Sequence, residues 1–243
     1  MIRIITLFQI DQATPSSEEI VVLLKGRHEE ILGGISIDVH STTAYISRFW
    51  LKPQIRGYSF GSILLQEAIS QLKKYPAINL RMGTHIYYIK NILLNNRFDR
   101  YEAFTHQQTT YDFYQLNVQD AKMFNFTHPY HLISNPDQDD CHLFFTLYEK
   151  GAINLYNVLK PLYIQVSNHD ERLGTVASFY GQKKLFIDHL SLSKDTIRHQ
   201  QLTNALIQYG KTLSIDTLHY LNGTNGQLDD KENVSYLQTL QFA

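Results

Sequence analysis

The sequence contains a single cysteine, Cys141, among its 243 residues. A lone thiol excludes an internal disulfide and a zinc site built from several cysteines. No apolar run approaches the roughly 20 residues that span a bilayer. The opening residues 1–10 carry one Arg, a short apolar run and no small-residue cleavage site, which is not the pattern of a signal peptide. These absences predict a cytoplasmic protein with no membrane contact.

Charged residues of either sign are also few. The formal net charge is −1, and no predicted helix carries a stripe of Lys and Arg, so the sequence offers no electrostatic basis for nucleic-acid binding. None of the eleven histidines forms a His-x-x-x-His pair beside a carboxylate, which argues against a bound metal. Hydrophobic residues make up 43% of the chain and charged residues 19%, as in an ordinary globular protein.

Glycine is sparse too, with 12 residues, and two of the glycines punctuate one informative stretch, residues 49–62. An apolar strand there runs into a short loop with Arg56, Gly57 and Gly61, and then into an amphipathic helix over residues 63–72. Glycine lets a backbone approach a ligand closely, and the unpaired N–H groups at a helix start point at an anion. This layout is suited to a diphosphate, to which Arg56 can add a charge-assisted contact.

The spacing separates this loop from two well-known phosphate binders. A Walker loop needs Gly-x-x-x-x-Gly-Lys-Ser/Thr, and a dinucleotide fingerprint needs three glycines; neither is present here. The stretch resembles motif A of the GCN5-related N-acetyltransferases (the GNAT superfamily), Gln/Arg-x-x-Gly-x-Gly/Ala. Arg56 fits the first position of that motif and Gly61 the last, while Ser59 stands where the middle glycine is usual. Trp50-Leu51-Lys52-Pro53 also looks like the strand end that precedes the motif in that family.

The resemblance implies that the strand end and the loop hold the pyrophosphate of acetyl-coenzyme A (acetyl-CoA) as cosubstrate, with no metal. The residues that it assigns to the cofactor are Phe49, Trp50, Leu51, Arg56, Gly57, Tyr58, Ser59, Phe60, Gly61 and Ser62. We expect Gly61 to leave room for the ligand, so that a carboxylate at this position would abolish binding with little loss of folding.

The surrounding residues follow the order of elements in the same family. Strands are expected over residues 18–29, 30–40, 44–52 and 77–82, a helix over residues 87–95, and a closing hairpin over residues 101–104 and 110–116. Arg97-Phe98 resembles the Gly-Phe that usually follows that helix. The resemblance covers residues 31–116 in the right order.

The second half of the chain repeats the first. Residues 46–51 align with residues 187–192, and residues 56–65 align with residues 198–207 after one extra residue. Gly57, Ser59 and Gly61 then correspond to His199, Gln201 and Thr203, whose side chains would block a close backbone approach. The second copy therefore resembles a degenerate GNAT module without the pyrophosphate loop.

These patterns predict an α/β (α+β) protein with two GNAT-like domains, each a mixed, mostly antiparallel central sheet flanked by helices. The expected boundaries are 1–118 for the acetyl-CoA-binding domain, 119–140 for a linker and 141–243 for the degenerate domain. Within the second domain, an apolar strand is expected from Cys141, a helix over residues 151–159, and strands over residues 163–166, 175–180, 185–192 and 217–221. A last helix is expected to end at Phe242.

Each half looks incomplete. The first lacks the two helices that usually cover the acceptor side, and the second ends with nothing left for its last two strands. An exposed sheet edge is an aggregation hazard, so we expect the halves to complete each other, with the N-terminal strand over residues 3–8 as a candidate donor.

At two catalytic positions of the family, this sequence does not carry the usual residues. The GNAT strand position that often carries a Glu base holds Ser47, and the position of the usual Tyr acid holds Leu93. Residues that could substitute as base or acid are Tyr45, Asp38, His85, Tyr87 and Tyr88. The catalytic candidates that we single out are Ser47, Tyr45, His85 and Tyr88.

The function predicted in this way is an acetyl-CoA-dependent N-acetyltransferase, an acyltransferase acting on a small-molecule or peptide amine. The alternatives are a non-catalytic CoA-binding sensor or scaffold, and a purely structural tandem-GNAT protein. A homodimer is compatible with the sequence, and the identity of the acceptor is set by loops that the pattern does not define.

Overall fold

The computed structural model describes residues 8–12, 18–40, 42–106, 108–123, 131–134, 136–151, 159–168, 171–192, 205–207, 209–215, 217–221 and 239–241. The chain divides into two compact units. One is Pro15–Lys160, and the other joins Met1–Thr14 to Pro161–Ala243. The division therefore lies about twenty residues beyond the predicted linker, and the N-terminal segment belongs to the unit formed by the C-terminal half.

The unit Pro15–Lys160 is built on a seven-stranded sheet with the order β6-β7-β5-β4-β3-β2-β8. Its strands are β2 (Glu18–Lys25), β3 (Ile31–His40), β4 (Thr43–Leu51), β5 (Asn79–Thr84), β6 (Asp99–His106), β7 (Thr109–Asn117) and β8 (His131–Ser134). Only β4 and β5 run parallel to each other, and every other neighbouring pair is antiparallel. The predicted mixed, mostly antiparallel sheet flanked by helices is confirmed for this unit.

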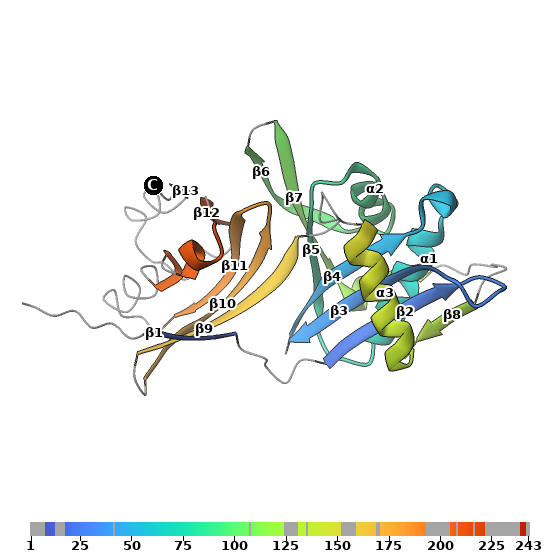
Figure 1. Ribbon diagram of the computed structural model, residues 1–243, viewed down its shortest axis with the longest axis horizontal. Helices are drawn as coiled ribbons and strands as arrows, with labels where there is room; N and C mark the ends of the chain where they lie inside the picture. The colour runs from blue at the N-terminus through green and yellow to red at the C-terminus, as the bar shows by residue number, and fades with distance from the viewer. Residues whose placement is uncertain are drawn as a thin grey trace, which may run out of the picture. The chain divides into compact units, whose positions relative to one another are not determined.

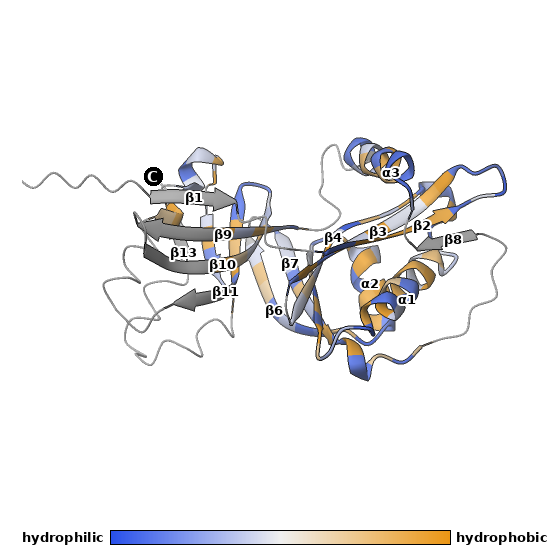
Figure 2. Ribbon diagram, turned by 90° about the horizontal axis from the view of Figure 1, so that it is seen from below, coloured by the Kyte–Doolittle hydropathy of each residue, from blue (hydrophilic) through white to orange (hydrophobic). Residues whose placement is uncertain are grey.

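Three α-helices lie on the two faces of this sheet (Figure 1). The helices α1 (Phe60–Leu72) and α2 (Tyr87–Asn95) lie on one face, and α3 (Gln138–Gly151) lies on the other. Figure 2 shows the same arrangement from below, with α3 across the sheet from α1 and α2. Short 3-10 helices, η1 (Pro53–Ile55) and η2 (Val118–Asp120), follow β4 and β7.

Strand β2 shows why the sheet holds helices on both faces. Its alternate residues Ile20, Val22 and Leu24 join the buried cluster under α1 and α2, while Val21 and Leu23 join the buried cluster under α3. Side chains alternate between the two faces of a strand, so a continuous apolar run is buried on both sides.

The helix α3 corrects two predictions. Residues 141–145 were expected to be a strand, but they lie in the middle of α3. The predicted linker 119–140 holds η2, β8 and the first residues of α3, and β8 pairs with β2 through Leu23↔Ile133 and Leu24↔Leu132. Most of the predicted helix over residues 151–159 lies outside the described residues.

The second unit has a six-stranded sheet with the order β1-β9-β10-β11-β12-β13. Its strands are β1 (Phe8–Gln12), β9 (Lys160–Asn168), β10 (Glu171–Gly181), β11 (Lys184–Leu192), β12 (Thr217–Tyr220) and β13 (Thr239–Gln241). Here β11 and β12 are parallel, and the pairs β1·β9, β10·β11 and β12·β13 are antiparallel. Residues 205–207 and 209–212 are helical. The strand β13 corrects two expectations. The chain was expected to end in a helix at Phe242, and no strand was expected beyond β12 in this sheet.

One edge strand is donated across the division of the chain. β1 comes before β2 in sequence, but it pairs with β9 of the second sheet. The predicted donation of the N-terminal strand therefore involves Phe8–Gln12, and the residues 3–7 of the predicted donor lie outside the described part of the chain. The first unit is continuous in sequence, and β8 and α3 follow β7 within it.

Candidate functional site

The predicted diphosphate loop connects β4 to α1. After Leu51 the chain passes through η1 and then takes positive φ angles at Gly57 (+87°) and Ser59 (+65°) before α1 begins at Phe60. Two left-handed residues so close together curl the backbone, which is the shape in which successive N–H groups can converge on an anion. Ser59 adopts this conformation without being glycine, at a cost of about 1–2 kcal/mol.

The N-terminus of α1 is open to a ligand. Ser59 occupies the N-cap position, yet its side chain makes no capping hydrogen bond, so the first amides of the helix keep their donor capacity. A Cβ added to Gly57 would meet no atom of the described residues within 4 Å. The loop therefore combines outward helix amides with free space, which fits a diphosphate.

Gly61 lies where α1 packs against its neighbours. It is buried, and a Cβ there would lie 2.5 Å from Cδ1 of Ile92 and 3.3 Å from Cδ1 of Leu51. The glycine thus permits α1 to pack against α2 and the end of β4. The effect of Gly61→Glu on coenzyme A binding and on folding stays a prediction, and a glutamate at this position would have to displace the end of the Ile92 side chain.

Arg56 and Tyr88 meet beside this loop. The Arg56 Nε donates to the Leu51 carbonyl at 3.0 Å, and its guanidinium lies 4.9 Å from the centre of the Tyr88 ring. The Tyr88 hydroxyl is buried and has no hydrogen-bond partner among the described residues. Burial raises the pKa of Tyr88, and the charge of Arg56 opposes that rise. A buried hydroxyl normally has a partner, so this group is one that a ligand can satisfy.

The strand end contributes backbone groups. The side chains of Phe49 and Leu51 are buried in the cluster under α1, and that of Trp50 is buried under α3. Lys52 donates its N–H to Leu32 on β3 at 2.8 Å. Since N–H groups alternate in direction along an antiparallel pair, the N–H groups of Leu51 and Phe49 point away from β3, toward the side of β5.

On that side, the described pairing of β4 ends early. The ladder between β4 and β5 consists of Thr43↔Asn79, Ala44↔Leu80 and Tyr45↔Arg81. Residues 46–51 of β4 have no strand beside them on this edge in the described part of the chain, and we call this stretch the open edge of β4. Gly83 of β5 accepts the N–H of Leu159 at 2.8 Å. Among the described residues, the open edge therefore offers backbone donors that no strand pairs with.

Ser47 lies at the end of this edge that is farther from the loop. Its side chain belongs to a polar network on the α3 face of the sheet. A bulge between β3 and β4 falls at this residue. Its Oγ lies 2.7 Å from Ser36 Oγ and donates to Asp38 Oδ1 at 3.1 Å. Ser36 in turn donates to Glu19 Oε1 at 3.0 Å, and Arg48 Nη1 lies 2.9 Å from the same oxygen.

The remaining catalytic candidates separate in space. Tyr45 is buried directly opposite Asp38 in the β3–β4 ladder, so both side chains lie on one face. His85 follows β5, and its ring lies 5.5 Å from that of Tyr111; burial and the charge of Lys90 lower its pKa. Tyr88 packs against the cluster on the α1 face. The structure joins Tyr45 and Ser47 around Asp38.

Other positions named in the sequence are distributed around the loop. Tyr58 and Tyr87 are exposed at 71% and 76%, and Leu93, at the position of the usual Tyr acid, is fully buried. Phe60 is half-buried against the core under α1, and Ser62 accepts a hydrogen bond from Asn96 Nδ2 at 3.0 Å. Cys141 is half-buried on α3. The described residues contain no group of three or more His, Cys, Asp or Glu side chains placed to hold a metal ion.

Sequence comparison finds a family match in the N-terminal part of the chain. Residues 4–87, about a third of the chain, match the family described as the Acetyltransferase (GNAT) family. The matched region includes β2–β5, the loop and α1, and it is the family that the motif resembles. No curated protein matches the chain. Among the described residues, none of the helices is long and apolar enough to cross a membrane.

Several solved structures resemble part of the chain. A putative acetyltransferase from Agrobacterium tumefaciens has 11% sequence identity and a TM-score of 0.38, with 41% of this chain and 74% of that one covered. An acetyltransferase from Bacillus cereus has 19% identity and a TM-score of 0.37, with 41% and 72% covered. The PaiA N-acetyltransferase from Thermoplasma acidophilum, solved in complex with coenzyme A, has 21% identity and a TM-score of 0.32, with 36% and 55% covered.

Proposed function

We propose that the protein is an acetyl-CoA-dependent N-acetyltransferase acting on a small-molecule or peptide amine. The observation that carries this proposal is the loop between β4 and α1, in which Gly57 and Ser59 curl the backbone in front of an uncapped helix N-terminus. The family match over residues 4–87 includes this loop. Helix amides and a nearby Arg56 favour a diphosphate over a neutral ligand.

The open edge of β4 extends the site toward the chemistry. Residues 46–51 offer roughly 20 Å of unpaired strand at about 3.3 Å per residue, which accommodates an extended arm leading away from the loop. The N–H groups of Phe49 and Leu51 on this edge can stabilise negative charge on a carbonyl oxygen, as donors placed at a developing oxyanion do. Their geometry is fixed by the pairing of β4 with β3.

Tyr88 is the proposed proton donor to the departing thiolate. Its hydroxyl is buried beside Arg56 without a described partner, and burial keeps it protonated at neutral pH. It lies on the α1 face, the same face as the loop. Tyr45 and His85 stay as further proposed contributors on the opposite face, without an assigned step.

The cofactor assignment can be tested with two variants that differ only in charge. Asn and Asp both tolerate a positive φ, and a Cβ at Gly57 meets no described atom, so Gly57→Asn and Gly57→Asp should fold alike. By calorimetry with coenzyme A, we expect Gly57→Asp to bind at least about tenfold more weakly than Gly57→Asn, about 1.4 kcal/mol. Equal affinities would reject the loop as the diphosphate site.

One observation favours the second candidate, a CoA-binding protein without catalysis. Ser47 stands where the family usually has a Glu base, and a serine alone is no base at neutral pH. Release of CoA thiol from acetyl-CoA in a panel of amines separates the two functions. A protein that binds coenzyme A but releases no thiol above the uncatalysed rate would be a sensor or scaffold.

A further inference from the structure

We propose that Asp38 binds the protonated acceptor amine and removes its proton, with Ser47 as its positioning residue. This inference rests on the proposed transferase function and names the base that the sequence pattern lacked. Two observations support it. One is the distribution of charge on the α3 face of the sheet, and the other is the position of Ser47 at the end of the open β4 edge that is farther from the loop.

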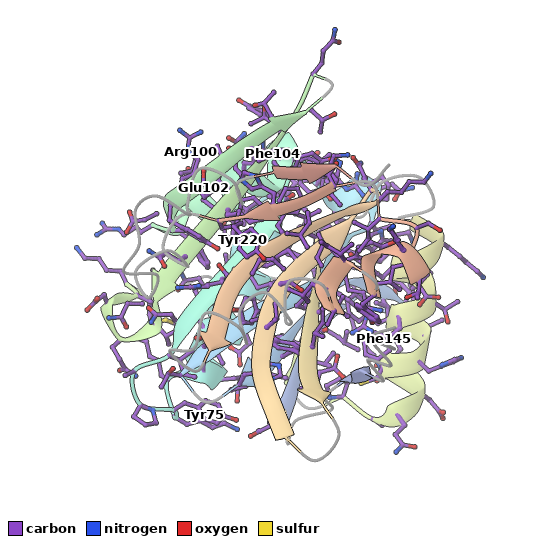
Figure 3. All side chains as sticks on the ribbon, turned by 90° about the vertical axis from the view of Figure 1, so that its left-hand side faces the viewer. Tyr75, Arg100, Glu102, Phe104, Phe145 and Tyr220 are labelled. Atoms are coloured by element: carbon purple, nitrogen blue, oxygen red, sulfur yellow. The ribbon has the colours of Figure 1, made fainter. Side chains whose placement is uncertain are left out.

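The polar network contains two carboxylates and only one of them is paired. Glu19 Oε1 is bound by Arg48 Nη1 at 2.9 Å and by Ser36 Oγ at 3.0 Å. The Arg48 guanidinium is held in place by the Phe145 ring of α3, 4.0 Å away; Figure 3 shows Phe145 on that helix. Asp38 accepts a hydrogen bond from Ser47 and has no cation within ion-pair distance among the described residues.

A partly buried carboxylate without a counter-ion favours a cationic ligand. Burial raises the pKa of Asp38, and the nearby charge of Glu19 raises it further, while Ser47, Arg48 and Lys160 lower it. The charged groups that act on Asp38 are therefore Glu19, Arg48 and Lys160. An ammonium group placed beside Asp38 would supply the missing positive charge.

The position of Asp38 is also suited to chemistry on the open edge. Asp38 pairs with Tyr45, which is the last residue of β4 in the ladder with β5. The edge opens at the next residue, and Ser47, which contacts Asp38, follows directly. The carboxylate lies on the face opposite α1, so the amine would approach from the α3 side while the diphosphate loop lies at the other end of the edge.

The hydroxyl network can accommodate the proton that Asp38 takes. In the charged state, Ser47 donates to Asp38 Oδ1. Once Asp38 is protonated, it can donate to Ser47 Oγ, and the Ser47 proton can turn to Ser36 Oγ, 2.7 Å away. Ser36 already donates to Glu19, so each hydroxyl keeps one donor role in both states.

The step balances as follows. Asp38 takes one proton from R–NH3⁺, and the nitrogen lone pair of R–NH2 attacks the thioester carbonyl carbon. The C–N bond forms, and the C–S bond breaks with its electron pair on sulfur. Tyr88 protonates the thiolate, the second ammonium proton leaves the nitrogen to solvent, and Tyr88 recovers a proton from solvent. The products are the amide R–NH–CO–CH3 and CoA-SH, and Asp38 returns its proton to solvent.

The test compares the full-length chain with Asp38→Asn, Asp38→Glu and Ser47→Ala. Coenzyme A affinity by calorimetry should stay close to that of the unchanged protein for all three, because none of these residues lies in the loop. A cooperative melt of each variant shows that it is folded. The acceptor probes are 1,5-diaminopentane, 2-phenylethylamine and a short peptide with a free N-terminus, with thiol release as the readout.

For the best of these acceptors, we expect Asp38→Asn to lower kcat/KM at least about 100-fold, within the usual range for a lost general base. The acidic limb of the pH profile should disappear in this variant. Asp38→Glu should restore part of the rate, and Ser47→Ala should move the acidic limb to higher pH, because the Ser47 hydrogen bond lowers the pKa of Asp38.

One result would overturn the inference and leave the proposed function standing: if Asp38→Asn keeps kcat/KM within threefold and retains the acidic limb, the protein is an acetyltransferase but Asp38 is not its base. If the unchanged protein binds coenzyme A and acetylates none of the three amines, both the role of Asp38 and the proposed transferase function are rejected, and the protein is the CoA-binding alternative. Absence of coenzyme A binding would reject the proposed function together with its cofactor site.

Discussion

The two sheets of the chain share a pattern of pairing but differ in the chemistry that they carry. Reading each from the edge that leads to its parallel pair gives β8-β2-β3-β4-β5-β7-β6 and β1-β9-β10-β11-β12-β13. In both, the parallel pair, β4·β5 or β11·β12, has an antiparallel neighbour on each side. A bulge falls at Ser47 in β4 and at Asp188 in β11.

The difference lies in the segments that follow the bulged strands. In the first unit the segment after β4 carries Arg56, Gly57 and Gly61, and in the second the aligned sequence carries Arg198, His199 and Thr203. A shared strand order therefore does not imply a shared site: the sheet places the loop, and the loop residues decide whether an anion can be held. Three predictions test this comparison.

The largest effect should come from removing the last elements of the first unit, β8 and α3. A fragment of residues 15–160 keeps β8 and α3 and should melt cooperatively, whereas residues 15–123 should not. Without α3, Val21, Leu23 and Trp50 lose their cover, at about 1.5–3 kcal/mol for each large side chain exposed. That loss is comparable to a whole domain's stability of 5–15 kcal/mol.

Circular dichroism and a thermal melt of the two fragments give the measurement. Cooperative melting of residues 15–123 at the temperature of residues 15–160 would show that α3 is an attachment rather than part of the core. Neither β8 nor α3 would then contribute to the stability of the first sheet.

A smaller effect should follow from one side chain of α3. The Phe144 ring is fully buried against β3, where Gly34 leaves room for it: a Cβ on that glycine would lie 2.7 Å from Phe144 Cε2. Phe144→Ala should lower the free energy of unfolding by about 3–5 kcal/mol. The matched control is Leu143→Ala, one residue away and 47% exposed, which should change it by less than about 0.5 kcal/mol. Equal losses in a urea titration would contradict the assigned helix face.

Local patterns predicted most of the first sheet. Alternation in residues 30–40 and 44–52 defined β3 and β4 to within a residue or two, and the predicted helix over residues 87–95 has the bounds of α2. The run from Cys141 to Phe145 was misread as a strand, because a short apolar run does not reveal its period. Only the sheet shows that Phe144 and Tyr148, four residues apart, face inward while Leu143 is exposed.

Non-local features could not be predicted to the same degree. The sequence indicated that the halves exchange a strand, but not that β8 and α3 return to the first unit, since this depends on which edges remain open after both sheets form. Gly61 suits either a ligand or a close helix contact, and the structure shows its contact with Ile92. The Ser47–Asp38 contact depends on the register shift at the bulge, which periodicity does not fix.

The smallest effect should be at Thr203, which aligns with Gly61 and lies outside the described residues. A loop that has lost its glycines to His199, Gln201 and Thr203 offers no close backbone approach, so we expect a single coenzyme A to bind each chain. Thr203→Glu should then leave its affinity within about twofold, less than roughly 0.5 kcal/mol, while Gly57→Asp weakens it. Calorimetry gives both the affinity and the stoichiometry. Two coenzyme A molecules per chain, or a loss with Thr203→Glu as large as with Gly57→Asp, would mean that the second unit has kept a binding loop of another sequence, and that glycine at these positions does not decide which unit binds.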